Sequence, residues 1–143
     1  MFIALIQRLR KLYWFVFRPH TTGVKSLICY QDEVLLIRNT YGTNTWTLPG
    51  GGVKRGEIPQ AAIVREVLEE VGIEVGEWKE LGTYESTLEY KRDTIYCFSL
   101  KVASREFHLL GKEVAEAEWF NVSKLPRDIS SSVTKAIDFM GRQ

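Results

Sequence analysis

Four glutamates that follow a run of glycines are the residues of this chain best suited to chemistry. The glycines are Gly50–Gly52 and the acidic residues are Glu57, Glu66, Glu69 and Glu70. At about 100° per residue, the last three lie within roughly 100° of arc on one side of a helix, where like charges repel. Hard divalent cations such as Mg²⁺ prefer carboxylate, carbonyl and water oxygens and bridge them to phosphates. The spacing therefore predicts a divalent-metal site for a phosphorylated substrate.

The residues around the glutamates fit that chemistry. Glycine-rich backbone approaches a ligand closely and can turn a carbonyl toward an ion. Arg65 lies four residues before Glu69 and can reach back to Glu57, so it would clamp the loop to the helix in an orienting role. Metal ions held there would polarise a phosphoryl group and activate water for attack on phosphorus. The alternative, a merely solvated acidic helix face, leaves the glycines and Arg65 unexplained.

The helix that carries the glutamates is predicted over residues 59–71. Pro59 suits the first turn of a helix, and Gly72 supplies a stop. An apolar stripe lies roughly opposite the glutamates. Its members are Val64, Val67, Leu68 and Val71. We therefore expect the helix to bury this stripe and to present its glutamates.

Alternating and periodic apolar runs predict the elements that surround this helix. Strands are expected at residues 24–30, 34–38, 46–48, 73–84, 94–102 and 115–120, with a turn at 31–32 and a second helix at 129–140. Because strands and helices alternate irregularly around one core, we expect a mixed β-sheet between helices. Residues 19–143 would form this one domain.

The composition is that of an ordinary globular domain. The chain has 143 residues, of which 45% are hydrophobic, enough to bury a core. Its formal net charge of +1 gives no electrostatic case for binding a nucleic-acid polymer. Cys29 and Cys97 are far apart in apolar segments, which favours reduced core thiols over a disulfide or a metal site. We infer a cytoplasmic protein.

Residues 1–18 are predicted to form a separate amphipathic basic helix. Apolar residues recur at helical spacing while basic residues gather elsewhere on the helical wheel. The apolar set is Phe2, Leu5, Leu9, Leu12 and Val16, and the basic set is Arg8, Lys11 and Arg18. The apolar run is shorter than the ~20 residues of a membrane span, and no signal-peptide cleavage site follows it. The helix would pack on the domain or on a partner subunit, or it would bind weakly at a membrane surface, making the protein peripheral.

Residues 51–73 resemble the Nudix box of the Nudix hydrolase family, including its MutT-like members. Gly51 is followed after five residues by Glu57, and after seven more by the sequence REVLEEVGI at 65–73. Every defining position of the box is filled. Residues 46–52 and 118–120 also look like the corresponding segments of family members.

The resemblance implies an α/β/α sandwich around a mixed β-sheet, and Mg²⁺- or Mn²⁺-dependent hydrolysis of a pyrophosphate bond. Glu69, Glu70 and the backbone carbonyl of Gly50 would then bind metal. Glu66 would bind metal or activate water, since family members differ in where their base lies. Glu113 resembles a further metal-binding glutamate of MutT-type members.

Glu57 and Arg65 complete the catalytic set that the resemblance implies. One position departs from the family pattern: Ile58 stands where many members have Ser or Thr. Those residues can cap the following helix, so Ile58 is expected to weaken the start of the helix and to leave the chemistry unchanged.

The substrate is expected to be a small nucleoside diphosphate linked to another moiety: a nucleoside triphosphate, a nucleotide sugar, ADP-ribose or a related dinucleotide. Recognition of a base or sugar needs aromatic faces and hydrogen-bond donors near the sheet. The candidates are Arg38, Tyr41, Trp46, Tyr84 and Arg92. The loop at 85–93 would close over the substrate or form a plain solvated hairpin. A nucleotide-binding or regulatory module without turnover is the alternative function, but it would not need all the acidic residues.

Overall fold

The computed structural model describes residues 2–17, 20–41, 44–87 and 92–143. Its elements, in chain order, are α1 (Phe2–Phe17), β1 (His20–Tyr30), β2 (Glu33–Asn39), β3 (Gly50–Gly52), α2 (Pro59–Val71), β4 (Glu77–Ser86), β5 (Arg92–Lys101), β6 (Val114–Asn121) and α3 (Ser131–Gly141).

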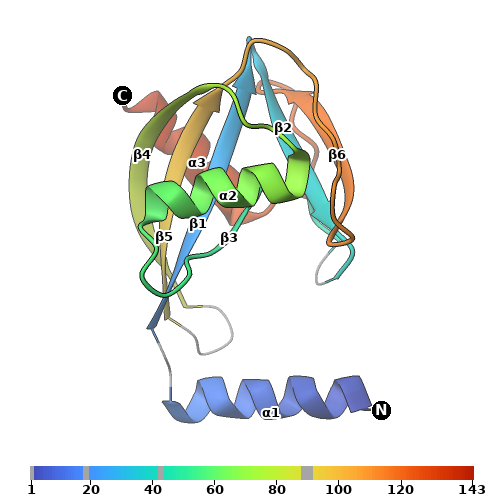
Figure 1. Ribbon diagram of the computed structural model, residues 1–143, viewed down its shortest axis with the longest axis vertical. Helices are drawn as coiled ribbons and strands as arrows, with labels where there is room; N and C mark the ends of the chain where they lie inside the picture. The colour runs from blue at the N-terminus through green and yellow to red at the C-terminus, as the bar shows by residue number, and fades with distance from the viewer. Residues whose placement is uncertain (1, 18–19, 42–43, 88–91) are drawn as a thin grey trace.

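The strands form one mixed sheet in the order β4-β5-β1-β2-β6, with β3 added beside β1 (Figure 1). β1 and β5 run parallel, and the other pairs are antiparallel. β1 pairs with β2 only at Cys29 and Tyr30, and with β3 at residues 23–25. The short β3 therefore fills the space where β1 and β2 diverge, and this brings the glycine run into the sheet.

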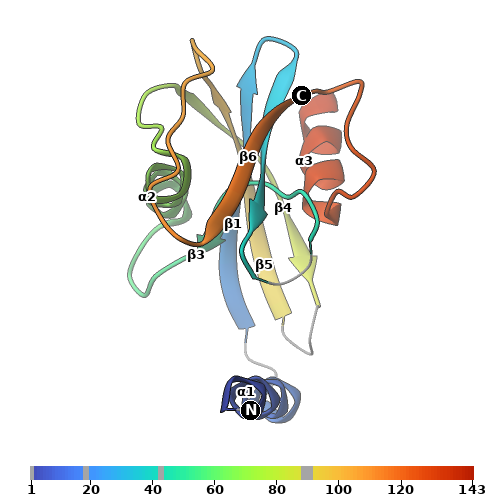
Figure 2. The ribbon, with the colours of Figure 1, turned by 90° about the vertical axis from the view of Figure 1, so that its right-hand side faces the viewer.

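Helices cover both faces of the sheet, with α2 on one side and α3 on the other (Figure 2). Side chains of β1 alternate between two apolar clusters. Val24 and Ile28 pack with Ile63 of α2, whereas Leu27 packs with Val133 of α3. This arrangement confirms the predicted α/β/α sandwich around a mixed sheet.

Several predicted boundaries were wrong. The strand expected at residues 73–84 begins only at Glu77, because Ile73 turns into the core beside α2 and Gly76 lies against Leu100 and Lys101 too closely for any side chain. Residues 46–48 make only isolated bridges, and the strand forms at β3 instead. The last helix begins at Ser131, since the residue two before it, Ile129, bridges to Trp46.

The predicted bounds of α2 are confirmed at both ends. Pro59 opens the helix, and Gly72 closes it with φ of 68° and a hydrogen bond to the carbonyl of Leu68. Ile58 precedes the helix without a side-chain cap. The predicted apolar stripe was partly wrong, because Val64 is exposed. The side chains that α2 buries are Ala62, Ile63, Val67, Glu70 and Val71.

The two cysteines lie within or beside the cluster on the α3 face. Cys97 is buried and Cys29 is half-buried, and both are free thiols. Burial raises the pKa of each thiol to about 11, so both stay protonated at neutral pH. This agrees with the expected reduced core thiols.

α1 stands apart from the sandwich, beyond the ends of β1 and β5, in both views (Figures 1 and 2). Its apolar side chains between residues 2 and 12 are exposed, so they are not packed on the domain. Among the described residues, no helix combines the length and apolar character needed to cross a membrane.

The buried face of α2 can be tested with two neighbouring residues. Ile63 is fully buried, whereas Val64 is exposed. Ile63→Ala should lower the free energy of unfolding by about 2–5 kcal/mol, because it removes core contacts and leaves a cavity. The matched Val64→Ala should stay within about 0.5 kcal/mol of the parent. Urea unfolding of the three proteins measures both values, and equal losses would contradict the orientation of α2.

Candidate functional site

Arg65 joins the loop before α2 to three glutamates. Its Nε and Nη2 donate to the two carboxylate oxygens of Glu57 at 2.9 Å each. Nη1 donates to Glu66 at 2.8 Å and to Glu69 at 3.5 Å, and Nη2 also reaches the carbonyl of Gly52 at 3.0 Å. A two-point guanidinium–carboxylate contact fixes orientation as well as charge. The geometry is that of the clamp expected from the sequence.

The Glu57 carboxylate also fixes the loop that precedes the helix. It accepts a hydrogen bond from the backbone N–H of Lys54 at 3.0 Å. The bonds from Arg65 and then from Lys54 lower the pKa of Glu57 to about 2. Glu57 therefore stays charged at neutral pH and holds the guanidinium in place.

The carboxylate of Glu70 is buried between α2 and the sheet, although the sequence predicted that Glu70 would lie on the exposed face of the helix with Glu66 and Glu69. It is only 9% exposed and accepts a hydrogen bond of 2.7 Å from the backbone N–H of Gly50. Burial and, to a smaller extent, the nearby Glu66 raise its pKa to about 8, against the opposing effect of the Gly50 hydrogen bond. A buried carboxylate is costly to charge without a cation beside it.

The glycine run is required by the space that these side chains occupy. A Cβ on Gly51 would lie 2.5 Å from the carboxyl carbon of Glu66, and a Cβ on Gly50 would overlap the carbonyl of Val24. A Cβ on Gly52 would meet nothing within 4 Å. Gly51 therefore makes room for the Glu66 carboxylate, and Gly50 lets β3 pair closely with β1.

A cavity of about 350 Å³ brings the predicted metal-binding glutamates together. Its lining includes Glu66, Glu69 and Glu70 of α2, with Lys112 and Glu113 from the segment before β6. That segment is held by Thr40, whose N–H donates to the Glu113 carbonyl at 2.8 Å. Residues more than 40 positions apart thus share one cavity.

The donor chemistry of this cavity fits a hard divalent cation, because every acidic lining group offers carboxylate oxygens. Within the described ranges, no three His, Cys, Asp or Glu side chains converge as a ready ligand set. The carboxylates line the wall, and the side chain of Glu69, 55% exposed, has room to turn. Glu66 and Glu69 are both held by Arg65 in the described arrangement.

The predicted substrate-binding residues lie in different places. Trp46 is buried against Phe120, and Arg38 covers its ring at 4.3 Å while pairing with Glu116, so both belong to the packing of the sheet. Tyr41 has an exposed ring, and the partial burial of its hydroxyl and then the carboxylate of Glu113 raise its pKa.

Tyr84 lines a second cavity, and Arg92 is exposed at the start of β5. Of the loop expected at 85–93, residues 88–91 lie outside the described residues.

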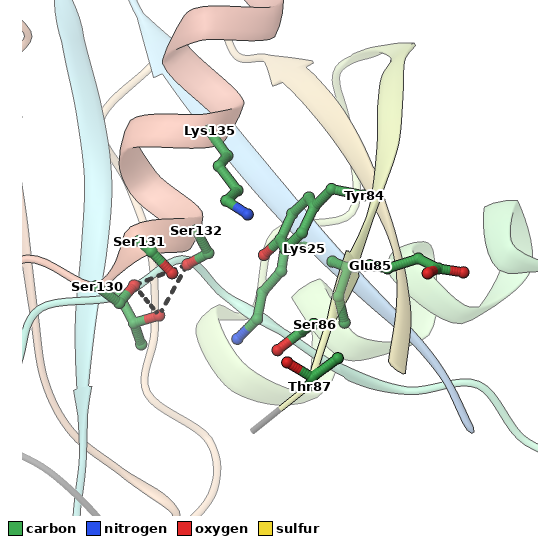
Figure 3. Close-up of a pocket in the computed structure, with 11 residues that line it drawn as sticks. Lys25, Tyr84, Glu85, Ser86, Thr87, Ser130, Ser131, Ser132 and Lys135 are labelled. Atoms are coloured by element: carbon green, nitrogen blue, oxygen red, sulfur yellow. Dashed lines mark hydrogen bonds between the residues drawn. The ribbon is translucent and has the colours of Figure 1, made fainter. Parts of the chain in front are cut away.

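The second cavity, of about 450 Å³, lies on the α3 face of the sheet (Figure 3). Lys25 enters it from β1 and Lys135 from α3, where the ammonium lies 4.3 Å from the centre of the Tyr84 ring. The hydroxyl of Ser130 donates to Thr47 at 2.9 Å and lies 2.7 Å from that of Ser132.

Sequence reasoning missed this second cavity. A usable signal was Lys25 inside an apolar strand, together with the Ser-Ser-Ser run at 130–132 before the last helix. Burial lowers the pKa of Lys25, and the carboxylates of Glu70 and Glu66 oppose that effect. Lys25 is also the register partner of Gly50, which donates to Glu70. The β1–β3 pair thus links Lys25, which lines the second cavity, to Glu70, which lines the acidic cavity.

Comparison with known proteins identifies one family model and several relatives that are similar to this chain. Residues 19–138 match the family model described as the NUDIX domain. An RNA pyrophosphohydrolase of Psychromonas ingrahamii is 37% identical over 75 residues, which are 52% of this chain and 40% of the relative. Diphosphoinositol polyphosphate phosphohydrolase 3-alpha of Mus musculus is 40% identical over 72 residues, 50% of this chain and 43% of the relative. The chain spans less than half the length of these two relatives.

A solved structure gives the same fold. The MutT NUDIX hydrolase of Burkholderia pseudomallei superposes with a TM-score of 0.77 at 22% identity, over 84% of this chain and 97% of the other. At that identity the likeness shows the fold alone.

The space around Glu66 can be tested with two adjacent glycines. Gly51→Ala should displace the Glu66 carboxylate, because the new Cβ would occupy its place. On the expectation that this cavity binds Mg²⁺, the variant should show a smaller rise in melting temperature with Mg²⁺ than the parent. Gly52→Ala should keep that rise, since its Cβ would meet nothing. Thermal unfolding with and without Mg²⁺ compares the two variants. An unchanged Mg²⁺ response in Gly51→Ala would contradict the role given to this contact.

Proposed function

Because the chain belongs to the NUDIX domain family, we propose that it is a Mg²⁺- or Mn²⁺-dependent hydrolase of a pyrophosphate bond in a nucleoside diphosphate linked to another moiety. The acidic cavity carries this proposal: Glu66, Glu69 and Glu70 share it with Glu113, and Arg65 fixes the helix that supplies them. Carboxylates gathered this way suit a cation that binds phosphate oxygens.

Glu69, Glu70, Glu113 and the Gly50 carbonyl are the proposed metal ligands, and Glu66 is either a further ligand or the base. The metal, when bound, would polarise the phosphoryl group and lower the pKa of a water molecule. Arg65 holds the Glu66 carboxylate at 2.8 Å, which limits the positions from which Glu66 can accept a proton.

Glu57 acts through Arg65 in this scheme. Its two carboxylate oxygens occupy Nε and Nη2, so Nη1 alone is left to face Glu66 and Glu69. Without Glu57 the guanidinium would turn more fully toward the α2 carboxylates and compete with a metal for them. Glu57 is thus a positioning residue.

The second cavity is the proposed site for the part of the substrate beyond the pyrophosphate. Its hydroxyl groups and the ammonium groups of Lys25 and Lys135 can donate to sugar hydroxyls or to a further phosphate, and the Tyr84 ring offers an apolar face. Lys25 lines the second cavity, and its register partner Gly50 donates to Glu70 of the acidic cavity, which supports a substrate that contacts both.

The reaction is tested by product release from a panel of substrates with and without Mg²⁺. The panel contains nucleoside triphosphates, nucleotide sugars, ADP-ribose, dinucleoside polyphosphates, a diphosphoinositol polyphosphate and a short 5′-triphosphorylated RNA. Metal-dependent turnover of a nucleotide is expected. Nucleotide binding in calorimetry without turnover of any panel member would favour the regulatory module instead.

Removing one carboxylate charge should slow this turnover. Glu69→Gln is expected to lower the rate by about a hundredfold or more, because it removes a negative charge from the proposed metal site. The side-chain volume hardly changes, so the fold should be kept. Glu74→Gln, the same change at an exposed position after α2, should leave the rate unchanged. Steady-state kinetics at several Mg²⁺ concentrations compare both with the parent. Equal rates for Glu69→Gln and the parent would refute the assignment.

The same assay separates the two roles open to Glu66. If Glu66 is the base, Glu66→Gln lowers kcat and leaves the Mg²⁺ concentration for half-maximal rate unchanged. If it is a ligand, that concentration rises as well.

Lys25 should affect substrate affinity more than chemistry. Lys25→Met is expected to raise KM for the preferred substrate about tenfold with little change in kcat, because it keeps the length of the side chain and removes the charge. Lys79→Met, at an exposed position of β4, is the matched control and should not change KM. A fall in kcat at constant KM would contradict a binding role for the second cavity.

A further inference from the structure

α1 exposes an unusual amount of apolar surface to solvent. Six of its side chains between residues 2 and 12 are 50–75% exposed: Phe2, Ile3, Leu5, Ile6, Leu9 and Leu12. Soluble proteins rarely expose a contiguous apolar patch of this kind unless it binds a partner or a membrane. Figures 1 and 2 show the helix away from the sandwich, so the described domain does not bury these apolar side chains.

Five of the six exposed side chains form a defined stripe, and Ile3 lies outside it. At about 100° per residue, Phe2, Leu5, Ile6, Leu9 and Leu12 fall within roughly 120° of arc. Arg8 and Arg10 lie about 100° to either side of the centre of this arc, and Lys11 lies nearly opposite it. The helix thus has one apolar face, with a basic residue at each edge of that face.

The charge on α1 has one sign only. Its sequence from Phe2 to Phe17 contains three basic residues and no Asp or Glu. Two copies of the helix packed stripe to stripe would bring the arginines at their edges together, and no acidic residue of α1 would pair with them. A surface of opposite charge would neutralise the same residues.

We propose that α1 binds flat on an anionic membrane surface and holds the domain there. The apolar stripe would enter the boundary between headgroups and acyl chains, while Arg8 and Arg10 would reach lipid phosphates on either side. The helix has 16 residues and lies along the surface, which agrees with the lack of a spanning helix in the described residues. This inference does not depend on the proposed hydrolase activity.

Vesicle flotation with the full chain tests the proposal. Vesicles contain phosphatidylcholine alone or with about 30 mol % phosphatidylglycerol. The parent protein should bind the anionic vesicles at least about tenfold more tightly, and about 0.5 M NaCl should weaken that binding because salt screens the attraction. Failure to float with anionic vesicles at low salt would overturn the proposal, and so would equal binding to both lipid compositions.

Point variants separate the contribution of the apolar stripe to membrane binding from that of the basic residues. Leu5→Ser/Leu9→Ser should weaken binding about tenfold or more by removing buried apolar area, and Arg8→Gln/Arg10→Gln should remove the preference for anionic lipid. Gln7→Ser, on the exposed polar face, is the matched control and should bind like the parent. All the changed side chains are exposed, so each variant should keep the melting temperature of the parent.

Sedimentation velocity without lipid tests the alternative that the apolar stripe binds a second copy of the chain. The proposal expects a monomer whose sedimentation Leu5→Ser/Leu9→Ser does not change. A dimer that this variant dissociates, together with absent flotation, would show that the stripe is an interface between chains and would overturn the proposal.

Discussion

The hydrogen bond from the Gly50 N–H to Glu70 joins α2 to the sheet beside the cavity that four carboxylates line. Glu70 lies in the face of α2 that packs on the sheet, beside Ile63 and Val67, so its carboxylate is held by the same contacts that hold the core. Like-charged neighbours and burial both oppose ionisation there. The apolar packing of α2 stabilises an arrangement that electrostatics alone would disperse.

That constraint explains the composition of the surrounding backbone. Gly50 must approach the Val24 carbonyl, and Gly51 must leave space for Glu66. β3 consequently has no side chains and contributes little apolar burial, which Arg65 offsets by binding the loop through Glu57 and the Gly52 carbonyl. Polar contacts of Arg65 connect the loop before α2 to the helix and to β3. Core packing holds the opposite, apolar face of α2 against the sheet.

Local signals in the sequence were enough to predict the β1–β2 hairpin, the ends of α2 and a mixed sheet between helices, and the family resemblance added the α/β/α sandwich. They also identified the carboxylates of α2, and the resemblance identified Glu113, all of which share one cavity. Ile63 and Val64 show the limit: both are apolar, and only contact with the sheet decides which is buried. Glu70 was assigned to the wrong face for the same reason. The cavity around Lys25 draws on β1, β4 and α3, and no local pattern reveals that these segments meet.

The parallel pairing of β1 with β5 has a consequence for how the domain forms. His20 lies opposite Arg92, and the register runs on to Cys29 opposite Lys101, so the centre of the sheet joins segments separated by most of the domain. Such distant contacts make folding slow, because a long loop must close before they stabilise anything. The hairpin and α2 can arise early from local contacts, yet Lys25 acquires its register partner Cys97 only when β5 pairs with β1. We therefore expect the second cavity, which Ile95 of β5 lines together with Lys25, to assemble late in folding, when the centre of the sheet closes.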